Sequence, residues 1–177
     1  MLSIDIETLG TESNAKIVSI GAVAHTFTHM HDRLYLLVNP SQTHRTVDLD
    51  TCAWWLTLPE TVQNALIDKP RYSLHGALEM LSKFCGVYGA PTITRDPDFD
   101  IRILRHAFDQ CGIDIPWKYN DHISVRTLDL FAHDEVVSHM LHNALADAEC
   151  NAQLFINVCK ENPSLIEGVT RRWPTVK

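Results

Sequence analysis

The sequence has neither a long apolar segment nor a paired arrangement of cysteines. No apolar run approaches the ~20 residues of a membrane-spanning helix, and the N-terminus has no basic lead followed by a small-residue cleavage site. The five cysteines are odd in number, widely spread and form no C-x-x-C pair, which argues against a disulfide framework or a structural zinc site. We therefore expect a cytoplasmic protein with reduced cysteines and no membrane partner.

Positive charge is scarce as well. The chain has 15 Lys and Arg against 22 Asp and Glu, which gives a formal net charge of -7 at pH 7. A protein that grips long nucleic acid through a broad basic surface neutralises many phosphates, and this composition disfavours that class. If nucleic acid is nevertheless the substrate, bound metal ions must supply much of the positive charge that meets its phosphates.

Repeats, low-complexity tracts and linkers are also missing. At 177 residues and 45% hydrophobic content, the chain is long enough for one domain with a sizeable core and too short for two comfortable ones. We expect a single domain over residues 1–177, with a catalytic core at about 2–160 and a C-terminal tail at about 163–177.

Hydrophobic periodicity predicts a mixed α/β fold. Short apolar runs rich in β-branched residues predict strands, and apolar positions three or four residues apart predict helices. The expected strands are residues 2–7, 17–24, 33–39, 91–94 and 122–128, and the expected helices are residues 48–56, 59–68, 73–88, 99–112 and 143–162. This order indicates a mixed five-stranded sheet flanked by helices, with the first three strands antiparallel and the later ones parallel.

Two carboxylates lie within the first predicted strand, in the segment SIDIET. Asp5 and Glu7 project from the same face of a strand, whereas Ile4 and Ile6 project from the other. Like charges this close conflict, and a divalent cation such as Mg²⁺ or Mn²⁺ between them removes the conflict. The spacing alone is weak evidence, because the chain has five acid-x-acid pairs. Their position in an apolar strand sets these two apart, since unpaired charge is costly there.

Further acids fall where they can complete such a site. Asp100 begins the helix that follows the strand at 91–94, so we expect it near the end of the sheet where ligands collect in α/β folds. Asp147 lies early in the last helix, five residues after His142. Taken singly, a helix N-terminal acid and a surface or capping histidine are the ordinary interpretations of these residues.

The order Asp5, Glu7, Asp100, His142 and Asp147 resembles the DEDDh 3′-5′ exonuclease superfamily, in particular its small phage and bacterial branch of the phage exonuclease A type. The resemblance runs from about residue 2 to residue 158. The matching segments are SIDIETLGTESNAKIVSIGAV, TCAWWLTLPETVQNAL, FDIRILRHAFDQCGIDIPWKYNDHISVRTLDL and LHNALADAECNAQL.

This resemblance implies an RNase H-like fold and a 3′-5′ exonuclease acting on single-stranded DNA or RNA with a free 3′ end. It implies that the four carboxylates hold two divalent ions, Mg²⁺ or Mn²⁺, and that His142 is the general base for the attacking water. Thr8 and Leu9 would lie against the terminal nucleotide. The resemblance also suggests a homodimer.

One segment departs from the family pattern. Where this branch usually has a Trp-Gly-Asn-Gly-type turn before the Phe-Asp pair, the chain has ITRDPDFD, so Asp96 and Asp98 compete with Asp100 for the third carboxylate position. Of the adjacent Trp54 and Trp55, we expect only one to face a cleft and offer a stacking surface to bases. The alternative function is a non-catalytic nucleic-acid-binding or regulatory module on the same fold.

Overall fold

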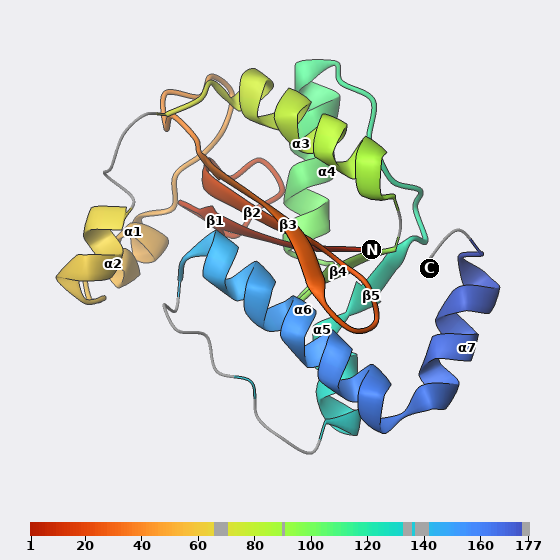
Figure 1. The fold of residues 1–177 in the computed structure, drawn as a ribbon. Coiled ribbons are helices and arrows are strands. Elements are labelled where there is room, and N and C mark those ends of the chain that lie inside the picture. The colour runs from red at the N-terminus through yellow and green to blue at the C-terminus, as the bar shows by residue number, and fades with distance from the viewer. Residues whose placement is uncertain (66–70, 90, 133–135, 137–141, 175–177) are drawn as a thin grey trace.

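A mixed five-stranded sheet forms the centre of the molecule (Figure 1). The computed structural model describes residues 1–65, 71–89, 91–132, 136 and 142–174. The strands are β1 (Leu2–Thr8), β2 (Ile17–His25), β3 (Met30–Leu37), β4 (Thr92–Thr94) and β5 (His122–Ser124), in the order β3-β2-β1-β4-β5. The first three strands pair antiparallel, and β4 and β5 continue the sheet in parallel. The mixed α/β sheet predicted from the sequence is thereby confirmed.

Helices cover both faces of this sheet (Figure 1). They are α1 (Leu49–Trp55), α2 (Glu60–Ala65), α3 (Leu74–Tyr88), α4 (Asp100–Cys111), α5 (Val125–Leu128), α6 (Ala144–Glu161) and α7 (Pro163–Arg172), with a 3-10 turn, η1, at Asp129–Phe131. α3 and α4 pack on one face, and α6 packs on β1 and β2 from the other. Among the helices of the described part, none combines the length and apolar character that spanning a membrane requires.

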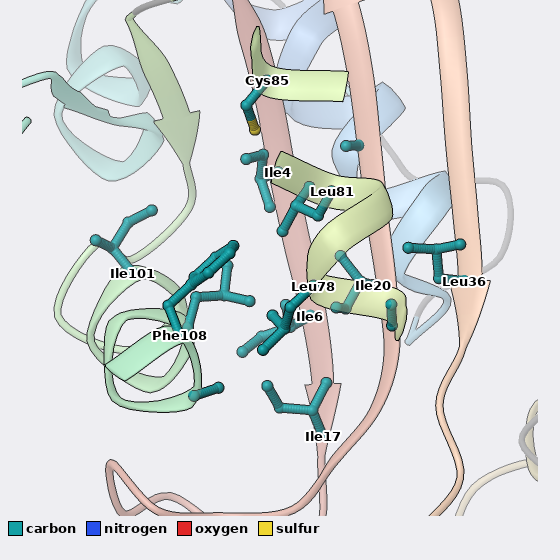
Figure 2. Packing of buried hydrophobic residues seen from close by; sticks show 14 of the residues in the cluster. Ile4, Ile6, Ile17, Ile20, Leu36, Leu78, Leu81, Cys85, Ile101 and Phe108 are labelled. Atoms are coloured by element: carbon teal, nitrogen blue, oxygen red, sulfur yellow. The ribbon is translucent and has the colours of Figure 1, made fainter. Parts of the chain in front are cut away.

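The main hydrophobic core lies between the sheet and the pair α3 and α4. Ile4 and Ile6 of β1 point into it and meet Leu78, Leu81 and Phe108 from the two helices (Figure 2). Because side chains alternate along a strand, the odd-numbered residues of β1 face α6 instead. The apolar positions of SIDIET therefore anchor β1 in the core and leave its two carboxylates on the opposite face.

α6 approaches β2 closely, because small residues line the contact. Ala148 and Ala152 of α6 pack against Val23 of β2, and all three are fully buried. A Cβ atom added to Gly21 would lie 2.1 Å from the carbonyl oxygen of Ala144, so only glycine fits there. The first turn of α6 thus rests directly on the middle of the sheet.

Two segments differ from the expected secondary structure. The strand expected over residues 122–128 ends at Ser124, and the next four residues form α5, because Val125 and Leu128 share one helical face and are both buried beside α6. Where we expected a C-terminal tail, the chain forms α7, whose Leu165 and Val169 pack against the same smaller core. Residues 66–68 of the expected helix at 59–68 fall outside the described residues.

Candidate active site

Two elements bring three carboxylates together. Asp5 and Glu7 project from β1 toward α6, and Asp147 meets them from the first turn of that helix. One oxygen from each carboxylate lies within 4.8 Å of the others. The helix begins at Asn143, whose side-chain oxygen accepts a hydrogen bond of 3.1 Å from the Ala146 backbone N–H. That cap fixes where α6 begins and hence where Asp147 stands.

Asp100 lies beside this trio, at the first turn of α4. It is 3% exposed and lines the same cavity as the trio. Asp96 also lines the cavity, but it is partly exposed and forms an ion pair of 3.3 Å with Arg126. Asp98 is exposed and lies outside the cavity lining. Of the three acids in ITRDPDFD, the structure therefore buries Asp100 next to the carboxylates.

Three of the four acidic groups have raised pKa values. Burial, followed by the charges of Asp147 and Asp100, raises the pKa of Glu7 to about 8. Burial also raises the pKa of Asp100 to about 7. The pKa of Asp5 is well above its ordinary value because of burial first and then Asp100, Glu7 and Asp147. Each of these three carboxylates thus carries an electrostatic penalty that a cation would relieve.

These donors fit a hard divalent ion. Mg²⁺ and Mn²⁺ favour carboxylate oxygens, and rigid elements hold these oxygens on two sides. A sulfur- or imidazole-preferring site would need Cys or His in the group, whereas the group found among the described residues consists of Asp5, Glu7 and Asp147. DEDDh exonucleases use divalent metal ions, and this acidic group is consistent with such a metal site.

His142 lines the carboxylate cavity just before α6 begins. Its backbone has a φ of +62°, in the left-handed region that non-glycine residues seldom adopt. Its ring meets the rings of Trp54 and Trp55 edge-on, with centroid distances of 4.7 and 6.1 Å. The unusual backbone and the aromatic contacts together hold the imidazole at the cavity wall.

A second, aromatic cavity adjoins the first. It is lined by Glu7, Thr8, Gly10, Thr11, Asp48, Asp50, Thr51, Trp54, Trp55 and Phe99. Glu7 and Phe99 line both cavities, so the two are continuous. Trp54 is 42% exposed, whereas Trp55 is buried and donates a hydrogen bond from Nε1 to the Thr8 carbonyl oxygen at 2.9 Å. Both tryptophans contribute to the lining, and Trp54 is the one with a free ring surface.

The predicted substrate residues fare differently. Thr8 lines the aromatic cavity, and its hydroxyl donates to the Gly10 carbonyl oxygen at 2.6 Å. Leu9 is half-buried and does not belong to the lining of either cavity. Arg102 belongs to neither lining, and it donates at 2.8 Å to the carbonyl oxygen of Thr11, a residue that lines the aromatic cavity.

The sequence analysis missed the arginines and the asparagine of the carboxylate cavity. Arg95, Arg126 and Asn151 all line it. Asn151 follows Asp147 by four residues on α6, a spacing that places both on one helical face. This spacing could have predicted Asn151 as a residue of the site. Arg95 stands inside ITRDPDFD, the segment that departs from the family pattern, so its position in the chain was a signal too.

Comparison with solved structures finds exonucleases with the same fold. E. coli Exonuclease I in complex with a dT13 oligonucleotide matches with a TM-score of 0.71 and 13% identity, over 94% of this chain and 42% of that one. The nuclease domain of 3′hExo, a DEDDh family member bound to rAMP, matches with a TM-score of 0.67 and 12% identity over 91% and 92% of the chains. Exonuclease X in complex with 5′ overhanging duplex DNA matches with a TM-score of 0.54 and 20% identity over 92% of both chains.

The chain thus spans less than half of E. coli Exonuclease I and nearly all of the 3′hExo nuclease domain. These likenesses confirm the predicted RNase H-like fold. A comparison with curated proteins gave no match. A family model, in contrast, matches residues 1–159, which include all five predicted catalytic positions. Since that match covers most of the 177 residues, the chain belongs to the family described as the 3′-5′ exoribonuclease Rv2179c-like domain.

Proposed function

We propose that this member of a 3′-5′ exonuclease family removes nucleotides one at a time from the 3′ end of single-stranded nucleic acid, with RNA as the preferred substrate. The observation that carries the proposal is the convergence of Asp5, Glu7 and Asp147, whose carboxylate oxygens lie within 4.8 Å of one another. Asp100 and His142 line the same cavity. The family description, an exoribonuclease domain, supports RNA over DNA.

The metal centre follows from the carboxylates. Asp5, Glu7, Asp100 and Asp147 would hold two divalent ions, Mg²⁺ or Mn²⁺. Such ions supply Lewis-acid activation of a water molecule and charge stabilisation for the departing oxygen. The chain itself contributes rigid placement, since β1 is anchored in the core and Asn143 caps α6.

His142 takes the proton of the attacking water. An imidazole is the side chain that changes charge near neutral pH, so a ring nitrogen can accept this proton and pass it to solvent. The ring is half-buried at the cavity wall and packs edge-on against Trp54 at 4.7 Å. This aromatic contact helps to hold the base at the cavity wall.

The aromatic cavity receives the terminal nucleoside. The exposed face of Trp54 offers a stacking surface that accepts any base, and Phe99 lines the passage toward the carboxylates. Glu7 and Thr8, which are adjacent on β1, both line this cavity. The scissile phosphate then falls at the carboxylates. The homodimer suggested by the family resemblance is part of the proposal, and the mass of the purified protein in solution checks it.

The first test compares RNA and DNA oligonucleotides of one sequence, each labelled at the 5′ end, with Mg²⁺ or Mn²⁺. We expect a ladder that shortens from the 3′ end, faster for RNA, and no ladder with EDTA. Asp5→Asn with Glu7→Gln removes the activity. Asp98→Asn is the matched control, because Asp98 is an exposed acid outside the cavity lining.

The alternative, a non-catalytic binding module, predicts a different result. Such a module would bind the oligonucleotides but leave their length unchanged with Mg²⁺ and with Mn²⁺. The variant with Asp5→Asn and Glu7→Gln would then give the same gel pattern as the wild type. A faster ladder with DNA would keep the exonuclease and reverse the substrate preference.

A further inference from the structure

Two arginines stand in a cavity otherwise dominated by carboxylates. Arg95 follows β4 and Arg126 lies on α5, and both line the carboxylate cavity but not the aromatic one. Among the described residues, they are the Lys or Arg side chains found in either lining. The two arginines are therefore the permanent positive charges that this cavity offers a substrate strand.

Each arginine is held loosely. Arg95 pairs with Asp129 at 3.7 Å and Arg126 with Asp96 at 3.3 Å, and the two arginine side chains are 57% and 68% exposed. Exposed ion pairs of this kind contribute little to stability. The guanidinium groups can therefore exchange these carboxylates for another anion at small cost, and phosphate matches their donor geometry.

Asn151 adds a buried donor to the same cavity. The residue is 3% exposed, and its Nδ2 has no hydrogen-bond partner within the part of the chain that the structure describes. A buried N–H group without an acceptor is costly, so its presence in a cavity lining points to a ligand oxygen. This observation is independent of the charge on the arginines.

We propose that Arg95, Arg126 and Asn151 form a subsite for the phosphate that lies directly on the 5′ side of the scissile one. This inference rests on the proposed function. If the terminal nucleoside occupies the aromatic cavity and the scissile phosphate meets the carboxylates, the strand leaves through the carboxylate cavity. The arginines line that cavity alone, so they meet the next phosphate along the strand.

The subsite gives the enzyme a short footprint. A formal charge of -7 disfavours a broad basic surface that follows a long strand, and two cationic side chains suffice for one upstream phosphate. The departure ITRDPDFD acquires a role here, because it supplies both Arg95 and the Asp96 that pairs with Arg126. Short oligonucleotides that keep this phosphate are then full substrates.

The test uses trinucleotides whose upstream linkage is either a phosphate or an uncharged methylphosphonate. Release of the 3′ nucleotide is measured as kcat/KM for the wild type, Arg95→Gln, Arg126→Gln and the double variant. Neutralising the linkage should lower the wild-type value roughly ten-fold, and the double variant's value by less than about two-fold. Arg171→Gln, an exposed arginine of α7 outside both linings, serves as the matched control and should behave as the wild type.

Equal effects of methylphosphonate on the wild type and the double variant would overturn the subsite. If the arginine variants lost kcat/KM equally on the phosphate and the methylphosphonate substrate, the arginines would contact the scissile phosphate. That result would overturn the assignment to the upstream phosphate. A wild type that cleaves the longer oligonucleotide but not the all-phosphate trinucleotide would contradict the short footprint, and failure on both refutes the proposed function instead. In that case the same four-way comparison, with equilibrium binding of a fluorescent trinucleotide as the readout, still decides whether the arginines bind the upstream phosphate.

Discussion

The hydroxyl of Tyr35 on β3 accepts a hydrogen bond of 3.1 Å from the side-chain Nδ2 of Asn143, the residue that caps α6. β3 lies at the edge of the sheet, two strands from the carboxylate strand β1. Because His142 precedes Asn143 directly, this bond connects the sheet edge to the proposed general base. Burial raises the pKa of Tyr35, which keeps the hydroxyl protonated.

Tyr35→Phe should lower kcat several-fold while leaving KM nearly unchanged. Removal of one hydrogen bond costs about 1 kcal/mol, and the freed Asn143 side chain no longer holds the residue beside His142. Steady-state kinetics and urea unfolding check this. A variant that lost stability but kept its full kcat would show that Tyr35 supports the fold only.

Gly21→Ala should disrupt the site more severely. The added Cβ would lie 2.1 Å from the Ala144 carbonyl oxygen, so the first turn of α6 must move away from the sheet. Overpacking of this kind costs about 1–3 kcal/mol, and the shift separates Asp147 from the carboxylates of β1. We expect reduced stability and activity below a hundredth of the wild type, since small misplacements of reacting groups can cost about that factor.

The matched control for this change is Gly86→Ala on α3. A Cβ at Gly86 meets no atom within 4 Å, and the residue is exposed. Alanine is the better helix former by about 1 kcal/mol, so this variant should be slightly more stable and fully active. Equal losses in both variants would contradict the close approach of α6 to β2.

Without metal ions, the protein should lose stability as the pH rises. The folded pKa of Glu7 is about 8 and that of Asp100 about 7, both above their ordinary values of 4.5 and 3.8. The folded state therefore holds more protons than the unfolded state across this window. The stability that the protonated groups contribute is complete below the ordinary values and is lost as the pH rises through the folded ones.

Divalent ions should reverse that loss. Binding at a hundred times the dissociation constant adds about 2.7 kcal/mol to the free energy of unfolding. Thermal unfolding followed across the window, in EDTA and in Mn²⁺, checks both effects. The variant with Asp5→Asn and Glu7→Gln should show a shallower fall and little gain from Mn²⁺. Above pH 6.5 His25 no longer contributes to the pH dependence, so a wild-type melting temperature that rose between pH 6.5 and about 8 in EDTA would contradict the placement of the acids in one cluster.

Local periodicity predicted the parts of the site that depend on one element. Asp5 and Glu7 share a face because side chains alternate along a strand, and the core packing of Ile4 and Ile6 fixes which face that is. The step from β1 to Asp100 needed one further rule, that acids at the ends of neighbouring parallel strands meet. β1 and β4 do pair in parallel, so this rule also held.

Features that depend on irregular backbone escaped prediction. The pairing of β1 with β2 shifts register between Glu7 and Thr8, so simple alternation cannot be extended to Leu9. Residues 125–128 combine β-branched residues with a helical spacing. They form a helix because this conformation buries Val125 and Leu128 together against the smaller core. Arg95 and Arg126 reach one cavity only because β4 and β5 are neighbours, a contact that no local pattern contains.

His25 should make the protein acid-sensitive independently of the active site. It is 2% exposed; its Nδ1 donates to the Thr26 carbonyl oxygen at 3.0 Å, and its Nε2 lies 3.1 Å from the Ser3 hydroxyl. Burial, with smaller contributions from the Met1 amino group and His31, lowers its pKa from 6.5 to about 4. The folded state therefore favours the neutral ring.

Because the folded pKa of His25 lies below the unfolded one, its contribution to stability is complete above pH 6.5 and is lost as the pH falls toward 4. The loss amounts to about 3 kcal/mol at most. Glutamine can donate and accept the same two hydrogen bonds but does not titrate, so His25→Gln should unfold less readily than the wild type in acid. Urea unfolding of both proteins across this range measures the difference, and parallel curves would show that the His25 ring is open to protons in the folded state.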